Sequence, residues 1–291
     1  MLKGLIGKKI GNNGKNGAQV ELLLLRKLDQ DIWEVLAKPG RRLAKGAKLL
    51  FGKGQLSAEV RDDTKFGGKI VKFFYEGIFQ DHLEELGKIP LPPYIHNHKE
   101  VSPQDYLAER YQTVYADVTG SAAAPTAGLH FTEELLKDLA ENGIQQAFVT
   151  LHTGLGTFRP IDKADIREHQ IHEEWYTVGA KTIEQIRQTK LKGGRVIAVG
   201  TTSTRVLETI QGVILGKDKP TEQSGFTNIF IYPGYKFKII DGLITNFHLP
   251  KSSLLVLAAA FAGRDFILRA YQEAIRQKYR FFSFGDALLI H

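Results

Sequence analysis

Between residues 20 and 77 the chain repeats one pattern, in which a short run rich in leucine, β-branched and aromatic residues is followed by a turn signal. The signals are KPG at 38–40, GKG at 52–54 and FGG at 66–68. Short strands at regular spacing with glycine or proline between them are typical of a small barrel or a curled sheet. The expected strands are VELLLL (20–25), IWEVLA (32–37), AKLLFG (47–52), LSAEV (56–60) and KIVKFFYEG (69–77), and GNNGKNG (11–17) is expected to be a loop or hairpin tip.

A change of pattern after this region predicts a domain boundary. Residues 78–87 have the spacing of one short amphipathic helix, and PLPPYI at 90–95 then places three prolines in six residues, which favours an extended connector. Beyond it, helical and strand patterns alternate, as in a layered mixed domain. We therefore predict an α+β protein. Residues 1–93 form a small antiparallel β-barrel domain, and residues 94–291 form a mixed-sheet α/β sandwich domain that carries the active site.

The second region predicts several elements in order. Thr132 is a suitable N-cap for a helix that ends at Gly143. Two strands are expected at 146–152 and 193–200, and the second passes directly into a helix over 201–210. A hairpin is expected between FTNIFIYPG (226–234) and YKFKIIDGLITNFH (235–248), and a small-residue helix over 252–263.

Charge and composition limit the function classes. The net charge is +7, and residues 1–60 hold twelve Lys and Arg against five Asp and Glu, whereas the later residues hold 27 of each. A basic sector of this kind is suited to nucleic-acid phosphates, although a solvated lysine-rich surface gives the same count. The absence of cysteine excludes disulfides and thiolate zinc sites. The longest apolar run, 254–262, is too short to cross a bilayer. These features predict a cytoplasmic protein.

Five histidines in the second region lie next to the ends of predicted elements, where side chains can converge on a cleft. Imidazole exchanges protons near neutral pH, so they are candidates for acid and base chemistry, although a single histidine is more often a structural hydrogen-bonding group. EHQIHEEW (168–175) also resembles a metal cluster, but it is not an HExxH motif, and we predict no metal site. The five are His130, His152, His169, His172 and His248.

TTSTR at 201–205 combines four hydroxyls, the free amides of a helix start and Arg205 within one turn. Such an arrangement suits a phosphate or a carboxylate, although an N-terminus with extra helix caps has the same residues. The sequence contains neither a Walker P-loop nor a GxGxxG turn after a strand. SAAAPTAGLH at 121–130 permits close approach, either of a ligand or of neighbouring backbone.

Three function classes remain open on these residues alone. The first is an acid–base transferase acting on a nucleic acid or nucleotide. The second is a metal-assisted hydrolase that uses the cluster around His169 and His172. The third is a non-catalytic RNA-binding module, although the chain has no RRM aromatic signature and no KH-type GXXG element in a suitable context.

Six blocks in order closely resemble the S-adenosylmethionine:tRNA ribosyltransferase-isomerase family. They are SAAAPTAGLHFT, TLHTGLGTFRP, EHQIHEEW, VGTTSTRVLET, TNFHLPKSSLL and YRFFSFGDALL. VELLLL, WEVLAKPGRRL, YEGIF and LPPYI also resemble the barrel insertion of that family. The resemblance covers nearly the whole chain.

The resemblance implies a step of queuosine synthesis. The family transfers and isomerises the ribosyl portion of S-adenosylmethionine onto 7-aminomethyl-7-deazaguanine at the tRNA wobble position. The products are epoxyqueuosine in tRNA, adenine and methionine. S-adenosylmethionine is then the ribosyl-donor substrate, tRNA carrying the modified base is the second substrate, and no cofactor is expected.

The same resemblance suggests roles for individual residues. The proton-transfer candidates are His130, His152, His169 and His172. The substrate-binding candidates are Thr126, Arg159, Glu168, Thr201, Thr202, Ser203, Thr204, Arg205, Asn246, His248 and Asp286. Arg205 and the neighbouring hydroxyls would hold the methionine carboxylate or an anticodon phosphate, with Arg159 as the rival. Phe281, Phe282 and Phe284 would either stack on a base or belong to the core, and the tRNA-binding candidates in the barrel are Arg41, Arg42 and Lys45.

One departure from the family pattern concerns the start of the chain. Members usually begin with a further segment of the α/β domain, which includes an SRL-like element and a strand ending near NNTRV, whereas this sequence begins almost at the barrel. We therefore expect the α/β domain to be incomplete in its N-terminal part, with an unpaired sheet edge. The expected result is a monomer of reduced stability or a compensating contact between chains.

Overall fold

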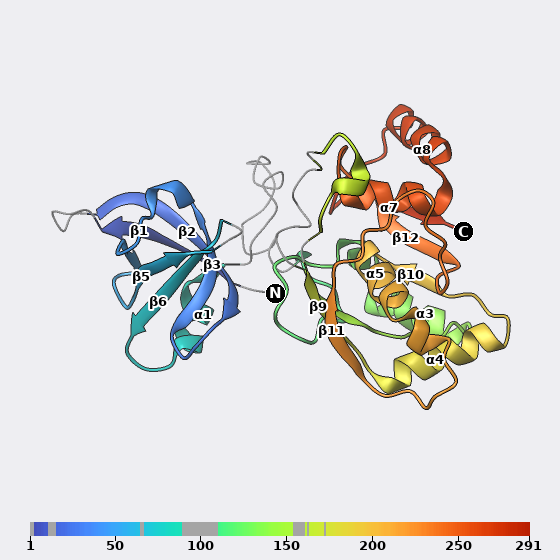
Figure 1. The fold of residues 1–291 in the computed structure, drawn as a ribbon, viewed down its shortest axis with the longest axis horizontal. Coiled ribbons are helices and arrows are strands. Elements are labelled where there is room, and N and C mark those ends of the chain that lie inside the picture. Colours follow the sequence, from blue (N-terminus) through green and yellow to red (C-terminus); the bar gives the residue numbers. More distant parts are fainter. Residues whose placement is uncertain are drawn as a thin grey trace. The chain divides into compact units, whose positions relative to one another are not determined.

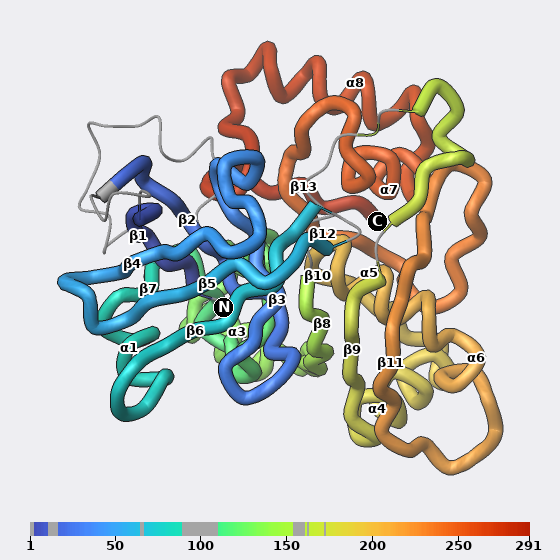
Figure 2. The backbone as a smooth tube through the Cα atoms, turned by 60° about the vertical axis from the view of Figure 1, so that its left-hand side comes forward, coloured from blue at the N-terminus to red at the C-terminus, as the bar shows by residue number. Residues whose placement is uncertain are grey.

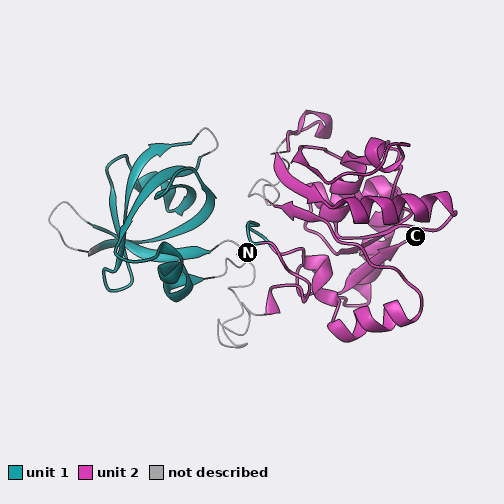
Figure 3. Cartoon of the chain, turned by 90° about the horizontal axis from the view of Figure 1, so that it is seen from below, with its two compact units in different colours: residues 1–109, 119–123 teal, residues 110–118, 124–291 magenta. Residues whose placement is uncertain are grey.

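The computed structural model describes residues 3–10, 16–64, 67–88, 110–153, 161, 163–171 and 173–291. Figure 1 shows the chain from its N-terminal barrel to its C-terminal helices and strand. It divides into two compact units, coloured separately in Figure 3. Unit 1 comprises residues 1–109 and 119–123, and unit 2 comprises residues 110–118 and 124–291. The boundary predicted between residues 93 and 94 lies outside the described residues and stays a prediction.

Unit 1 contains a closed antiparallel barrel of six strands. Its strands are β1 (Gly4–Ile10), β2 (Asn16–Lys27), β3 (Ile32–Lys38), β4 (Lys48–Phe51), β5 (Leu56–Asp63) and β6 (Lys69–Tyr75). They pair in the order β2-β3-β6-β5-β4-β1, and the β1–β2 pairing closes the ring. Alternate residues point inward, as in Leu56, Ala58 and Val60 of β5, and form one apolar core. The predicted barrel is therefore confirmed.

Short elements, a helix, a strand and a 3-10 turn, are added to this barrel. The predicted helix is α1 (Phe79–Leu86), and β7 (Gly87–Lys88) adds two residues beside β1. The 3-10 turn η1 (Gly40–Arg42) follows β3 and exposes Arg41 and Arg42, with Lys45 exposed just beyond it. We call these three residues the basic turn. The ammonium group of Lys9 donates to the carbonyl of Arg42 over 2.9 Å, which adds a fourth cation to this surface.

Unit 2 combines two three-stranded sheets with helices. One sheet has the order β10 (Ile197–Val199), β12 (Gly242–Asn246), β13 (Ala287–Ile290), and the other has the order β11 (Gln223–Thr227), β9 (Glu174–Val178), β8 (Thr150–His152). The α-helices are α3 (Glu133–Glu141), α4 (Ala180–Leu191), α5 (Thr201–Thr209), α6 (Gln211–Ile214), α7 (Ser253–Ala262) and α8 (Arg264–Arg276), and two 3-10 turns are η2 (Thr126–His130) and η4 (Ile166–Glu168). Helices α7 and α8 lie at the opposite end of the unit from α4 (Figures 1 and 2). The predicted α+β class is confirmed.

The predicted helix starts in unit 2 are correct because their caps form. The Thr132 side chain accepts from the Leu135 amide over 3.1 Å, and the Ser252 side chain accepts from the Leu255 amide over 3.2 Å. The strand predicted over 193–200 is shorter and consists of β10 alone, and the helix predicted after it is present as α5. The strand predicted over 146–152 is shorter and consists of β8 alone.

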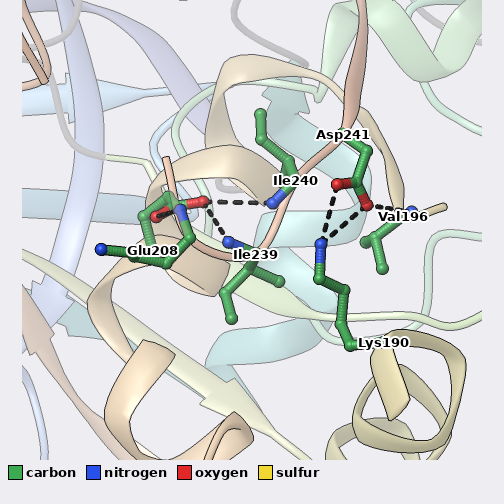
Figure 4. A network of polar contacts seen from close by, with 7 residues as sticks. Lys190, Val196, Glu208, Ile239, Ile240 and Asp241 are labelled. Atoms are coloured by element: carbon green, nitrogen blue, oxygen red, sulfur yellow. Dashed lines mark hydrogen bonds and ion pairs between the residues drawn. The ribbon is translucent and has the colours of Figure 1, made fainter. Parts of the chain in front are cut away.

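The predicted hairpin between 226–234 and 235–248 is wrong. β11 pairs with β9, whereas β12 pairs with β10 and β13, so the two segments enter different sheets. The physical reason is the buried carboxylate of Glu208 (Figure 4). It accepts from the backbone amides of Lys238, Ile239 and Ile240 over 3.0 to 3.2 Å, which uses donors that a hairpin partner would need.

No helix in the described part of the chain is long and apolar enough to cross a membrane.

Candidate active site

Strands β10 and β12 run parallel and bring their carboxyl ends to one edge of the sheet. Val199 lies opposite Ile244, and the Gly200 amide donates to the Ile244 carbonyl over 2.8 Å. Gly200 has a φ of +91°, which glycine adopts without strain, and the chain turns there into α5. The start of α5 therefore lies beside Asn246, the last residue of β12. In open sheets with parallel strands, this edge is where ligands commonly bind.

The turn η2 packs against the same edge. A β-carbon added at Gly128 would lie only 1.9 Å from the Tyr115 hydroxyl. The turn can therefore lie this close to Tyr115 only because glycine has no side chain. Thr126 and His130 both reach Asn246 from this turn. The Thr126 hydroxyl donates to Oδ1 of Asn246 over 2.9 Å, and Nδ2 of Asn246 donates to Nε2 of His130 over 3.1 Å. We call this series the Thr126–Asn246–His130 chain.

The loop before β13 completes the edge. Because Ala287 pairs with Asn246, the preceding Asp286 is carried to the same end of β12. The Arg280 guanidinium donates to Asp286 over 2.8 Å, and the Arg280 amide donates to the same carboxylate over 2.7 Å. Gly285 has no room for a side chain against the Arg280 carbonyl, so the loop closes tightly. This clasp holds one anion and one cation near His130.

The charges at this edge act on one another. Burial lowers the pKa of His130, the Asp286 carboxylate opposes that shift, and the Arg280 guanidinium adds to it. The hydrogen bonds from Arg280 lower the pKa of Asp286, to which His130 also contributes. His130 is therefore a neutral imidazole at neutral pH, with an ionised carboxylate close by.

The hydroxyls of TTSTR divide between the interior and the edge. Thr201 and Thr204 are buried, and Thr204 donates to the Gly200 carbonyl over 3.2 Å, whereas Thr202 and Ser203 are half-buried at the helix start. Arg205 lies inside the unit, where it pairs with the buried carboxylate of Glu174 and donates from Nε to the Ile229 carbonyl. Its Nη2 has no hydrogen-bond partner among the described residues. Arg205 thus has an internal counterion and one unused nitrogen.

The other described candidate histidines contact residues outside the Thr126–Asn246–His130 chain. His152 packs on the Trp175 ring at a centroid distance of 4.9 Å, and its pKa is lowered by burial. His169 meets the Phe230 ring edge-on at 5.3 Å. His248 shares a hydrogen bond of 2.8 Å with Thr245, whose side chain points to the face of β12 opposite Asn246. Burial lowers the pKa of His248 to about 4.

Further predicted residues fall elsewhere. Glu168 is exposed at the end of η4, while His172 and Arg159 lie outside the described residues. Among the residues that the structure describes, no three His, Asp or Glu side chains gather closely enough to hold a metal ion.

Of the three phenylalanines, Phe281 packs on Phe247 and Tyr271 at the edge of the core. Phe282 also packs on Phe281. Phe284 is 40% exposed and meets the Tyr111 ring. Phe284 is therefore the most exposed of the three, and whether any of them stacks on a base stays a prediction.

Sequence reasoning missed Arg280. The signal was present in YRFFSFGDALL, where an arginine precedes an aspartate by six residues across a glycine-containing turn. Such spacing allows a side chain to close a tight loop on itself. Without the pairing of β13 with β12, however, nothing in the sequence places that loop beside His130.

Comparisons with known proteins agree on one family. A sequence profile of the family described as queuosine biosynthesis protein matches residues 5–290. S-adenosylmethionine:tRNA ribosyltransferase-isomerases from Thermoanaerobacter sp. (strain X514) and Caldanaerobacter subterraneus subsp. tengcongensis are each 54% identical over 97% of this chain and 80% of their own length. The crystal structure of S-adenosylmethionine tRNA ribosyltransferase from Thermotoga maritima matches with 37% identity and a TM-score of 0.47, over 99% of this chain and 78% of that one.

Proposed function

This chain belongs to the queuosine biosynthesis protein family, and we propose that it acts as an S-adenosylmethionine:tRNA ribosyltransferase-isomerase. Its substrates are S-adenosylmethionine and a tRNA that carries 7-aminomethyl-7-deazaguanine at the wobble position. It moves and isomerises the ribosyl portion onto the aminomethyl group, which gives epoxyqueuosine in tRNA and releases adenine and methionine. S-adenosylmethionine is consumed as a ribosyl donor.

The observation that supports this proposal best is the Thr126–Asn246–His130 chain, which lies at the carboxyl edge of β10 and β12 beside Asp286. The reaction removes a C5′ proton that the neighbouring sulfonium acidifies, and it stabilises adenine as it leaves. Both steps need polar groups held in fixed positions, and general acid–base groups work best when their pKa is near the working pH. His130 is the described histidine that this chain of hydrogen bonds holds in a fixed position, and His152, His169 and His172 stay candidates for proton transfer.

The start of α5 supplies the second part of the proposed site. Its free backbone amides and the half-buried hydroxyls of Thr202 and Ser203 suit the methionine carboxylate. Arg205 can add only Nη2, because its other contacts lie with Glu174 and Ile229. Arg159 remains the alternative cation.

The basic turn is the proposed contact for tRNA. Arg41, Arg42 and Lys45 are exposed, and Lys45 forms an ion pair with Asp62 at the surface, with a separation of 3.6 Å. An exposed pair of this kind is weak, so the lysine remains able to meet phosphate. That the protein is cytoplasmic and monomeric also stays a prediction.

The test is to incubate the protein with S-adenosylmethionine and tRNA containing 7-aminomethyl-7-deazaguanine, then to measure free adenine and digest the tRNA for mass spectrometry. Adenine release matched by the epoxyqueuosine mass supports the proposal. His130→Gln should reduce the rate of adenine release by about 10²-fold or more, since that is the usual contribution of one positioned polar group in an active site. His82→Gln, on the half-buried side of α1 in unit 1, is the control and should leave the rate unchanged. No adenine and no new nucleoside from the unaltered protein would refute the function.

A further inference from the structure

Asn246 is the central residue of the candidate site, because its amide is engaged at both ends. The side chain is 2% exposed, with Oδ1 held by the Thr126 hydroxyl and Nδ2 held by His130. An amide has one accepting end and one donating end, so the two hydrogen bonds are coupled. When Thr126 donates to Oδ1, Nδ2 must face the imidazole.

This arrangement determines the tautomer of His130. A neutral imidazole carries its proton on one ring nitrogen and accepts at the other. Since Nε2 accepts from Asn246, the proton resides on Nδ1. The ring therefore has its lone pair already used, and it offers the substrate an N–H group.

We infer that Asn246 is a positioning residue which, oriented by Thr126, holds His130 as a hydrogen-bond donor through Nδ1 and prevents it from acting as the base. This inference rests on the proposed function and assigns His130 one role within it. The Nδ1–H group stabilises negative charge that develops on an electron-rich substrate atom as a bond to the ribosyl unit breaks. No proton is transferred by His130 in this role, and removal of the C5′ proton is left to a different group.

The surroundings of His130 fit a donor. The Asp286 carboxylate lies close enough to act on the ring, yet Arg280 holds it with two hydrogen bonds. Asp286 therefore does not take the ring proton. Thr126, Asn246 and the clasp between Arg280 and Asp286 come from three separate segments, and each limits what the imidazole can do.

The test measures the tautomer directly. Nitrogen-15 NMR of the full-length protein labelled at histidine distinguishes protonated from unprotonated ring nitrogens, and His130→Gln identifies the signals. The expected result at neutral pH is a protonated Nδ1 and an unprotonated Nε2. Asn246→Asp replaces the donor by an acceptor, so Nε2 should gain the proton. Asn142→Asp, at the exposed end of α3, is the matched control and should leave the His130 signals unchanged.

Activity gives the second readout. Asn246→Asp should lower kcat on the order of 10²-fold, as expected for loss of one positioned donor, with little change in the KM for S-adenosylmethionine. His130→Asn, which can place an N–H group near the position of Nδ1, should retain more activity than His130→Gln. Thr126→Val is a milder variant in case the aspartate variant does not fold, and it should yield both tautomers.

A protonated Nε2 in the unaltered protein would overturn the inference. It would also be overturned if Asn246→Asp or Thr126→Val lowered kcat without changing the tautomer. The NMR measurement needs no substrate, so it stands even if the proposed reaction is not observed.

Discussion

Removal of the Glu208 carboxylate should destabilise unit 2 strongly. Glu208 is fully buried and accepts three backbone N–H groups, together with the Tyr235 hydroxyl over 3.2 Å. In Glu208→Ala those donors lose their acceptor, and two of the amides, from Ile239 and Ile240, belong to buried residues. Each buried donor left unsatisfied costs roughly 1–3 kcal/mol. We expect the free energy of unfolding of unit 2 to fall by about 3–5 kcal/mol.

The assay is thermal unfolding followed by calorimetry. For a unit of this size, 1 kcal/mol corresponds to about 2–4 °C in Tm, so the transition of unit 2 should move down by about 10 °C. Glu208→Gln keeps one accepting oxygen, so its Tm should lie between that of the unaltered protein and that of Glu208→Ala. Glu141→Ala, which removes an exposed carboxylate from the last turn of α3, is the control and should leave Tm unchanged. A decrease below about 2 °C for Glu208→Ala would refute the reasoning, since the donors to Glu208 would then have found other partners.

Three further predictions follow from charge and burial. Reversal of all three charges of the basic turn should weaken tRNA binding by at least about tenfold at low salt and should make the salt dependence of binding shallower. The control Lys137→Glu, on α3, should change neither quantity. Unchanged binding by the triple variant would place the tRNA elsewhere. The pKa of His248 is about 4 in the folded protein and about 6.5 in the unfolded chain, so the unfolded chain binds more protons between these two pH values. The free energy of unfolding should therefore fall by on the order of 3 kcal/mol as the pH drops from about 6.5 to 4. His248→Gln should flatten that part of a urea-unfolding pH series, and an unchanged slope would contradict the assignment. Glu174→Ala should lower the free energy of unfolding by about 3–5 kcal/mol because it leaves the Arg205 guanidinium buried without its counterion. Glu174→Ala combined with Arg205→Met should recover much of that loss. Equal stability of the single and the double variant in urea would argue against a buried ion pair.

Much of the fold was predictable because its signals are local. The turns at 38–40 and 52–54 lie between barrel strands, and the hydroxyls of Thr132 and Ser252 cap helices where the sequence places them. The expected strand at 56–60 is also present, within β5. Each of these features depends on residues within a few positions of one another.

The failures depend on contacts between distant segments. Residues 226–248 have the composition of a hairpin, but Glu208 takes the amides that would pair, from about thirty positions earlier in the chain. The position of Arg205 in TTSTR likewise gives no sign that its guanidinium pairs with Glu174. The roles of Thr126 and Asn246 as substrate contacts stay predictions, and their hydrogen bonds that lead to His130 are visible only in the structure. No local pattern reports such pairings, so only the three-dimensional fold reveals them.

The candidate site joins residues that are synthesised far apart in time. Thr126 and His130 precede Asn246 by 120 and 116 positions, and the clasp at Arg280 and Asp286 follows later still. The barrel, in contrast, closes through strands that end at Tyr75. During translation the barrel can fold while most of unit 2 is still unmade. The candidate site can be assembled only after β13 has been added, so it forms late in the synthesis of the chain.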